Sequence, residues 1–240
     1  MTDQIRLNKF LAERLGISRR EADEAIAAGR VTIDGQKATL GARLEFEKID
    51  KMPKVCYNGN IVPSETDFLY LAFNKPVGYV CSRHAQGSAP TLYEILPKEY
   101  QKLKSVGRLD KDSSGLILLT NDGDFAFKMT HPKFQKEKQY EVTLDRPLEP
   151  LHQQMISDYG VMLDDGPSKF TVIRGGSRQD PCSYVAILRE GRNRQIRRTF
   201  AALGYHVTAL HRTTFGPFAL TGLAPGKYEL IPREQIKNVL

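Results

Sequence analysis

The chain has 240 residues, enough for one large domain or for a small domain followed by a medium one. Its content of 40% hydrophobic and 26% charged residues is ordinary for a soluble globular protein. The longest apolar runs, such as residues 116–119, are too short to span a bilayer. The net charge of +7 and the isoelectric point near 9.2 fit a partner that carries phosphates, although charge alone does not require one.

Neither the N-terminus nor the cysteines point to secretion. The first residues lack the basic start and the apolar stretch of a signal peptide. Cys56, Cys81 and Cys182 are too few and too scattered for a disulfide framework or a zinc site. We therefore expect reduced thiols in a cytoplasmic protein.

The N-terminal segment predicts two helices followed by a hairpin. Apolar residues recur at helical spacing over 7–15, and Gly16 follows as a natural stop. Ser18 and Glu21 have the spacing of a capping box, which opens a second helix. An Asp34-Gly35 turn between two short β-like runs then predicts the hairpin.

A polar, turn-forming segment at 63–67 is the predicted linker between domains at 4–62 and 68–240. Beyond it, short β-like runs alternate with a few helical patterns. The expected strands are 69–73, 116–120, 139–144, 184–188 and 205–210, and the expected helices are 124–130, 148–158 and 193–203. These elements predict an α+β fold whose larger domain is built on a mixed, mainly antiparallel sheet.

The segment at 107–115, Gly-Arg-Leu-Asp-Lys-Asp-Ser-Ser-Gly, precedes a buried strand and has two simple interpretations. One is a calcium loop, because Asp110, Asp112 and Ser114 have the spacing of its ligands. This interpretation fails at the twelfth position, where Asn121 replaces the required glutamate, and an apolar strand lies where a helix should follow. The other is a plain polar turn, which is the default for Asp110 taken alone.

Two later segments carry further polar side chains. Tyr140, in Lys138-Gln139-Tyr140, is by itself typical of a half-buried aromatic residue on a strand. Five arginines lie within 189–198, a density that fits a phosphate-binding surface. A planar guanidinium near a helix start is equally suited to hold a carboxylate by two hydrogen bonds.

Together, and in this order, these segments resemble the RsuA-like family of ribosomal RNA pseudouridine synthases. The N-terminal pattern, over about 6–62, resembles the alpha-L RNA-binding motif. The residues that carry the two resemblances are Ser18–Ala22 and Gly29–Val31 in the motif, and Lys75–Gly78, Gly107–Asp110, Lys138–Tyr140, Gln195–Arg197 and Leu210–Arg212 in the family pattern. The resemblance implies that Asp110 is the nucleophile, that Tyr140 is the active-site aromatic, and that Arg197 pairs with Asp110.

The expected partner is structured ribosomal RNA whose target uridine is flipped out of its helix. The candidate RNA-binding residues are Arg6, Lys9, Arg19 and Arg20 in the N-terminal module, and Lys75, Arg108, Arg192, Arg194, Arg198 and Arg212 in the larger domain. Ribosome-assembly intermediates are further candidate partners, and we expect a monomer that does not contact a membrane.

The implied reaction detaches uracil from N1 and rejoins it to the ribose through C5. It involves no redox change and no group donor, so we expect neither a cofactor nor a metal. The five histidines also lack metal-ligand spacing: His84, His131, His152, His206 and His211.

Two rival functions stay open at this stage. A non-catalytic ribosome-assembly factor would only bind RNA, and it would have no need of Asp110, Tyr140 and Arg197 together. An N-glycosylase would cleave the uridine bond without rejoining it, and it would release free uracil. The target uridine, and the choice between ribose and base as the atom that Asp110 attacks, are also open.

Overall fold

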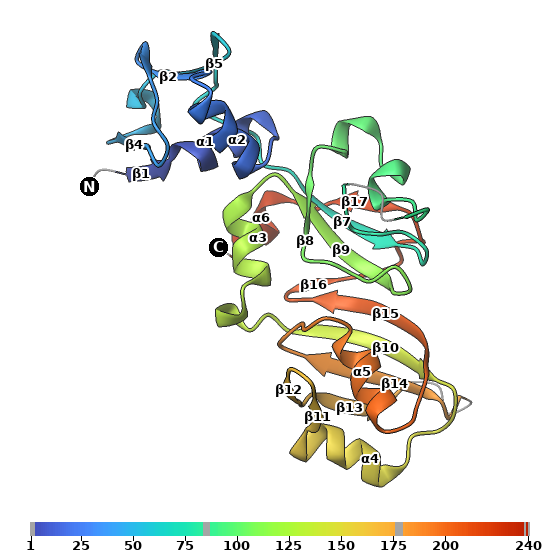
Figure 1. Ribbon diagram of the computed structural model, residues 1–240. Helices are drawn as coiled ribbons and strands as arrows, with labels where there is room; N and C mark the ends of the chain where they lie inside the picture. The colour runs from blue at the N-terminus through green and yellow to red at the C-terminus, as the bar shows by residue number, and fades with distance from the viewer. Residues whose placement is uncertain (1–2, 84–86, 176–179, 238, 240) are drawn as a thin grey trace. The chain divides into compact units, whose positions relative to one another are not determined.

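The computed structural model describes residues 3–83, 87–175, 180–237 and 239, and the chain forms two compact units (Figure 1). The first comprises Met1–Leu69 with Asn121–Gly123, and the second comprises Tyr70–Thr120 with Asp124–Leu240. Within the described ranges, every helix falls short of the length and apolar character that a membrane crossing requires.

The first unit combines two helices with short antiparallel strands. Its elements are β1 (Asp3–Arg6), α1 (Leu7–Leu15), α2 (Arg19–Ala27), β2 (Val31–Ile33), β3 (Gln36–Lys37), β4 (Arg43–Phe46), a 3-10 turn (Ile49–Lys51), β5 (Val55–Tyr57) and β6 (Asn60–Ile61). Gly16 ends α1 with a φ of 70°, and Ser18 and Glu21 cap α2 reciprocally. The predicted order of helix, helix and hairpin is therefore confirmed.

Strands that the sequence pattern did not predict complete this unit. β1 pairs antiparallel with β4, and β5 and β6 extend the hairpin to a four-stranded sheet of order β3-β2-β5-β6. These four additional strands have two to four residues each, too few for an alternating pattern to be recognised. Leu7, Phe10, Leu44 and Val55 are buried in one cluster, so helices and strands share a core.

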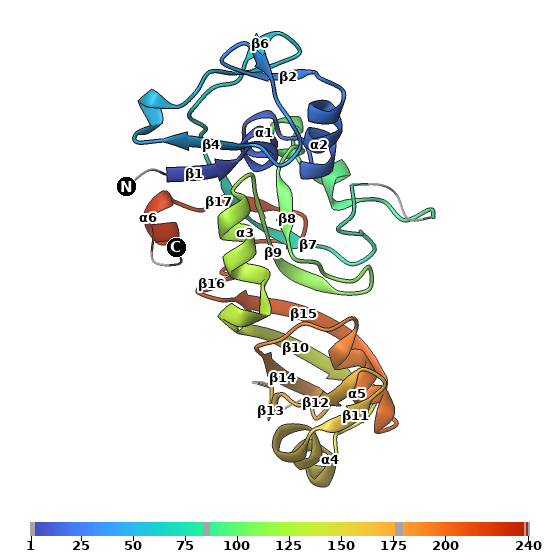
Figure 2. The same cartoon turned by 60° about the vertical axis from the view of Figure 1, so that its left-hand side comes forward.

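The second unit is organised around a nine-stranded sheet of order β13-β14-β10-β15-β9-β7-β17, with β16 beside β15 and β8 beside β9 (Figure 2). The strands are β7 (Tyr70–Lys75), β8 (Lys104–Val106), β9 (Ser114–Thr120), β10 (Lys138–Leu144), β13 (Thr171–Arg174), β14 (Ser183–Leu188), β15 (Val207–Phe215), β16 (Phe218–Ala219) and β17 (Tyr228–Leu230). Among the described residues, β15 and β9 form the one parallel pair. The predicted α+β fold on a mixed, mainly antiparallel sheet is confirmed.

Helices and a small hairpin surround this sheet. They are α3 (Gly123–Thr130), α4 (Pro150–Gln154) with a π-helical turn at Met155–Tyr159, the hairpin β11 (Val161–Leu163) and β12 (Gly166–Ser168), α5 (Gln195–Ala202), α6 (Arg233–Lys237), and 3-10 turns at Leu92–Ile95, Lys98–Tyr100 and Pro132–Phe134. The helix predicted at 193–203 starts later, because Arg194 adopts a left-handed φ of 45°. The strand predicted at 205–210 instead runs over Val207–Phe215.

The parallel pairing of β9 with β15 is short, and we call this contact between the two strands the seam. Its register consists of His211 opposite Ser114 and Arg212 opposite Gly115. Gly115 has a φ of 107°, and a Cβ atom there would overlap the backbone amide and carbonyl of Arg212. Only glycine permits this approach. Because residues 107–113 lead directly into β9, the seam also brings that loop next to β15.

Candidate active site

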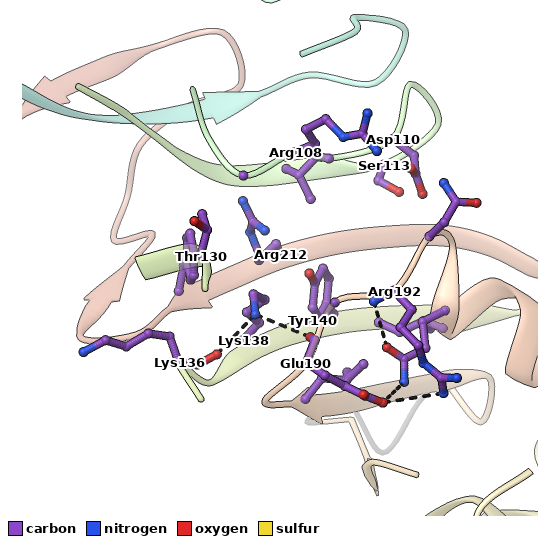
Figure 3. A pocket seen from close by; sticks show the side chains of 18 of the residues that line it. Arg108, Asp110, Ser113, Thr130, Lys136, Lys138, Tyr140, Glu190, Arg192 and Arg212 are labelled. Atoms are coloured by element: carbon purple, nitrogen blue, oxygen red, sulfur yellow. Dashed lines mark hydrogen bonds and ion pairs between the residues drawn. The ribbon is translucent and has the colours of Figure 1, made fainter. Parts of the chain in front are cut away.

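A cavity of about 330 Å³ opens beside this seam in the second unit (Figure 3). The loop at 107–113 supplies Arg108 and Asp110, the strand β10 supplies Lys138 and Tyr140, and β15 supplies Arg212. The segment at 189–196, between β14 and α5, lines the cavity as well. Segments distant in the sequence therefore bring acidic, basic and aromatic side chains to one pocket.

Asp110 lies on a loop whose backbone carbonyl groups are fixed by hydrogen bonds. Its side chain is 34% exposed, and its carboxylate lies 3.8 Å from the Arg194 guanidinium. Five successive carbonyl oxygens, of residues 109–113, each accept a hydrogen bond; the donors are Cys81 Sγ, Ser113 N, Gly78 N, Arg197 Nη2 and Lys75 Nζ, in that order. This saturation fixes the path of the loop, and with it the position of the Asp110 carboxylate.

Arg197 does not pair with Asp110, so that expectation was wrong. Among the described residues, the ion pair within 4 Å of Asp110 is made by Arg194. The Arg197 guanidinium instead donates to the carbonyls of Val207 (2.7 Å) and Asp112 (2.8 Å), and its Nε lies 3.3 Å from the Asp112 carboxylate. Arg194, which has a left-handed φ of 45°, contacts the carboxylates of both Asp110 and Asp112, whereas Arg197 contacts that of Asp112 alone.

The carboxylate of Asp112 forms ion pairs with both Arg194 and Arg197. Arg194 donates two hydrogen bonds to its carboxylate, at 3.0 and 2.8 Å. These bonds, with the nearby charge of Arg197, hold the pKa of Asp112 below its ordinary value. Asp112 therefore remains ionised and ties α5 to the loop that carries Asp110.

The floor of the pocket is formed by one face of β10 and β15. Lys138 and Tyr140 lie two positions apart on β10, so their side chains face the same side of the sheet. Arg212 lies opposite Tyr140 on the neighbouring strand β15. Tyr140 is half-buried and packs against two apolar clusters of this unit. Its ring is thus held firmly while one side borders the cavity (Figure 3).

Lys75 is not placed to bind RNA, which corrects a second expectation. Its side chain is completely buried, with a relative exposure of 0%. Its ammonium donates to the carbonyls of Ser113 (2.6 Å) and Pro76 (3.0 Å), and burial lowers its pKa. Lys75 therefore supports the loop of Asp110 from within. Arg212 is also almost fully buried, yet it borders the cavity.

The remaining candidate RNA-binding residues lie in different settings. Arg108, Arg192 and Arg194 line the cavity, and Arg192 is anchored by the backbone carbonyls of 165–167. Arg198 pairs with Asp165 and lies outside the cavity lining. In the first unit, Arg6, Arg19 and Arg20 are exposed, whereas Lys9 is half-buried 3.9 Å from Glu13.

The sequence interpretation missed Lys138 as a member of the site. Its two-residue spacing from Tyr140 on a strand was the available signal, because such residues face the same side. It also missed Gln195, which is buried and donates to Ser168 Oγ and to Glu190, thereby fixing the turn at 190–195.

No group of three or more His, Cys, Asp or Glu side chains suited to a metal ion occurs in the described part of the chain. Cys56, Cys81 and Cys182 are free thiols. His84 lies outside the described residues.

Comparisons with known proteins agree with this arrangement. The family described as RNA pseudouridylate synthase matches residues 69–202, and the S4 domain matches residues 5–49. The ribosomal small subunit pseudouridine synthase A of Pasteurella multocida is 37% identical, over 97% of this chain and 98% of that protein. Its namesake in Escherichia coli K12 is 36% identical, over 98% and 100%.

Two further relatives extend the comparison. The ribosomal large subunit pseudouridine synthase B of Pseudomonas aeruginosa is 34% identical, over 96% of this chain and 60% of that protein. A crystal structure of a pseudouridylate synthase superposes with a TM-score of 0.68 at 32% identity, covering 98% of this chain and 100% of that chain. The chain therefore belongs to the RNA pseudouridylate synthase family.

Proposed function

We propose that this protein converts a uridine of ribosomal RNA to pseudouridine, with Asp110 as the nucleophile and Tyr140 as the aromatic that stacks on the extruded base. The carrying observation is the juxtaposition of an ionisable carboxylate, a rigid tyrosine ring and a cationic lining around one cavity of nucleoside size. Membership of the pseudouridylate synthase family supports this chemistry. A non-catalytic RNA-binding role gains no support from the comparisons.

The reaction requires a nucleophile, a dry pocket and a proton acceptor. The Asp110 carboxylate attacks the nucleoside, the C1′–N1 bond breaks, and the base turns so that C5 can bond to C1′. Tyr140 supports the base and helps accept the proton lost from C5. The Arg194 guanidinium lies 3.8 Å from the Asp110 carboxylate and is the cation nearest to it among the ion pairs of the described residues. Arg197 positions the loop rather than the carboxylate.

The proposed substrate is small-subunit ribosomal RNA. This choice follows the names of the relatives that match along nearly their whole length. We further propose that the enzyme acts as a monomer in the cytoplasm on ribosome-assembly intermediates, because a target uridine must leave its helix and can do so more easily before the particle is complete.

The proposed division of labour assigns RNA docking to an S4-type module at 4–62, a linker role to 63–67, and chemistry to 68–240. The S4 match at 5–49 supports the first assignment. Exposed arginines at 6, 19 and 20 provide phosphate contacts of the kind that position an RNA without specifying its sequence.

The decisive experiment maps pseudouridine in both ribosomal RNAs from cells with and without this chain, and from cells carrying Asp110→Asn. We expect one site to lose its modification in the second and third strains, because an amide cannot act as the nucleophile. Tritium release from C5-labelled RNA should fall to background in Asp110→Asn, while RNA binding persists. Unchanged maps would refute the proposal, and release of free uracil would indicate an N-glycosylase.

A further inference from the structure

We propose that Lys138 and Arg212 form an anion subsite on the pocket floor, which binds the uracil ring in the anionic form that it takes after the C1′–N1 bond breaks. This inference rests on the proposed function and identifies which groups stabilise the detached base. It is carried by the burial and the unused hydrogen-bonding capacity of two cations that border the same cavity as Asp110.

Arg212 is the first part of the argument. The residue is 2% exposed, and its Nε donates to the carbonyl of Leu116 at 2.7 Å. Its Nη2 atom is buried and has no hydrogen-bond partner among the described residues. The guanidinium carbon lies 4.8 Å from the centre of the Phe215 ring. Buried guanidinium N–H groups are almost always paired, so an unpaired one in a residue that lines a cavity indicates an acceptor that arrives with the ligand.

Lys138 is the second part. Its ammonium makes two long hydrogen bonds, to the carbonyls of Lys136 (3.2 Å) and Glu190 (3.4 Å). Burial, followed by the nearby charge of Arg212, lowers the pKa of Lys138 to about 8. Two like charges thus border the same floor of one cavity, an arrangement that the arrival of an anion would relieve.

The position of Tyr140 indicates which anion this is. Tyr140 follows Lys138 on the same face of β10 and lies opposite Arg212. Lys138 and Arg212 lie near the Tyr140 ring in Figure 3, so a pyrimidine stacked on that ring would present a polar edge, with O2 or O4, to these cations. Backbone phosphates have another place to bind, because the arginines at 108, 189 and 194, which line the cavity, are exposed to solvent.

In the proposed reaction, negative charge develops on the uracil ring, which lies at the pocket floor. Uracil enters as a neutral ring, which a dry pocket admits more easily than a hydrated phosphate. When C1′–N1 breaks, the bonding pair leaves with the base and spreads over N1, O2 and O4. C1′ is then bonded to Asp110 or loses a neighbouring proton. When C5 bonds to C1′, the bond from C1′ to Asp110 breaks and frees the carboxylate, or, on the other path, the lost proton returns to C2′; this consumes the charge on the ring. The C5 proton then leaves to a base, and N1 gains a proton. Lys138 and Arg212 only donate hydrogen bonds, so no further reactant is needed.

The test compares Lys138→Met and Lys138→Arg with Lys169→Met, which removes an exposed charge outside the cavity lining. In single-turnover assays at saturating RNA, we expect Lys138→Met to be at least about 100-fold slower, with RNA affinity changed by less than about threefold. Lys138→Arg should keep a tenth or more of the rate, and Lys169→Met should match the parent. Thermal unfolding verifies that each variant is folded.

A second measurement separates anion stabilisation from simple positioning. RNA with 5-fluorouridine at the target position yields a more stable base anion, so the defect of Lys138→Met in glycosidic bond cleavage should shrink by about tenfold or more. A defect of equal size on both RNAs would overturn the proposal. So would a loss of RNA affinity at an unchanged rate, which indicates a phosphate subsite.

Failure of the proposed function and failure of the subsite give different results. If the parent chain modified no ribosomal RNA, the proposed function would fail. If the parent is active and Lys138→Met has a normal rate, only the subsite is refuted.

Discussion

At the scale of residues, Arg194 and Arg197 serve the same loop in different ways. The Arg194 side chain is 44% exposed and touches two carboxylates, whereas the Arg197 side chain is 11% exposed and binds two backbone carbonyls. Loss of a buried donor leaves its acceptors unpaired, while loss of an exposed ion pair costs little stability. Their substitutions should therefore separate stability from catalysis.

We predict that Arg197→Ala loses about 2–4 kcal/mol of unfolding free energy. Arg194→Ala should lose no more than about 1 kcal/mol. With Asp110 deprived of its cation, Arg194→Ala should nevertheless slow the single-turnover rate at saturating RNA by tenfold or more, an effect of about 1.4 kcal/mol. Denaturant titration and rate measurements on both variants provide the check. A stable Arg197→Ala paired with a fully active Arg194→Ala would contradict this division of roles.

Lys138 should show the cost of a buried cation in the stability of the protein. Its pKa falls from an ordinary value of 10.5 to about 8, through burial and the charge of Arg212 on β15, opposed by Glu190 after β14. Between these pH values the unfolded chain binds more protons than the folded one, so this group makes stability rise with pH. Below pH 8 the full penalty for the charged form applies.

Lys138→Met should consequently be more stable than the parent by about 2 kcal/mol at pH 7, a figure reduced from the full pKa shift because the side chain is only half-buried. The difference should nearly close by pH 10.5, where the parent lysine is neutral in the folded chain and half neutral in the unfolded chain. Chemical denaturation at both pH values measures it. A variant less stable than the parent at pH 7 would show that Lys138 contributes packing rather than strain.

Some of these residue roles could be predicted from the sequence and others could not. Asp110 and Tyr140 stand in short local motifs, and both line the cavity. The partner of Arg197 depends on a hydrogen bond across 85 positions, which no local pattern encodes. Lys75 was predicted to bind RNA because the sequence does not reveal that its side chain is buried and that its ammonium group donates to the carbonyl of Ser113.

At the scale of elements, the seam between β9 and β15 is the feature most sensitive to a single atom. Gly115 and Arg212 approach so closely that any side chain at 115 collides with backbone, which cannot move aside as a flexible side chain can. Gly166 offers a matched control, because its φ of 103° is nearly the same as the 107° of Gly115 but nothing lies within 4 Å of its Cβ position.

Gly115→Ala should destabilise the protein by about 3–5 kcal/mol, since backbone strain and overpacking add. Gly166→Ala should cost about 1–2 kcal/mol from strain alone. The first variant should also lose activity, because the loop of Asp110 leads into β9 at this point. Thermal melts and tritium-release assays on the two variants test this, and equal losses would mean that φ, not the close approach, makes glycine necessary.

Elements with strong periodicity were predictable, whereas short or irregular ones were not. The cores of β7, β9, β10 and β14 lie where the pattern predicts them. So do α3, α5, and α4 together with the π-helical turn that follows it. β15 was misplaced because its apolar residues do not alternate cleanly: His211 and Arg212 are drawn into the seam. Strands of two or three residues, such as β16 and β17, gain their identity only from pairing partners.

At the scale of the whole molecule, basic residues serve two purposes in two units. The second unit places several of its cations around one cavity, among them Arg192, Arg194 and Arg212, and these three also donate to acceptors within the unit. The first unit instead leaves the arginines at 6, 19 and 20 exposed on helix and strand ends, in a setting suited to phosphate contacts of low specificity. Docking and chemistry should therefore be separable by truncation.

Removal of the residues before about Pro63 tests this separation. The truncated chain keeps the nine-stranded sheet with its own apolar clusters, so it should remain folded. It should bind ribosomal RNA more weakly, and a plot of log affinity against log salt should be shallower by about 0.7–0.9 for each phosphate that the module no longer neutralises. At saturating RNA its single-turnover rate should remain within about threefold of the parent rate, since differential binding at the reacting centre is unchanged.

The matched full-length control, Arg19→Ala with Arg20→Ala, should reproduce part of the slope change without truncation. If the truncated chain binds as tightly as the parent at several salt concentrations, the module does not dock RNA. If affinity falls while the salt slope stays constant, the module binds groups other than phosphates.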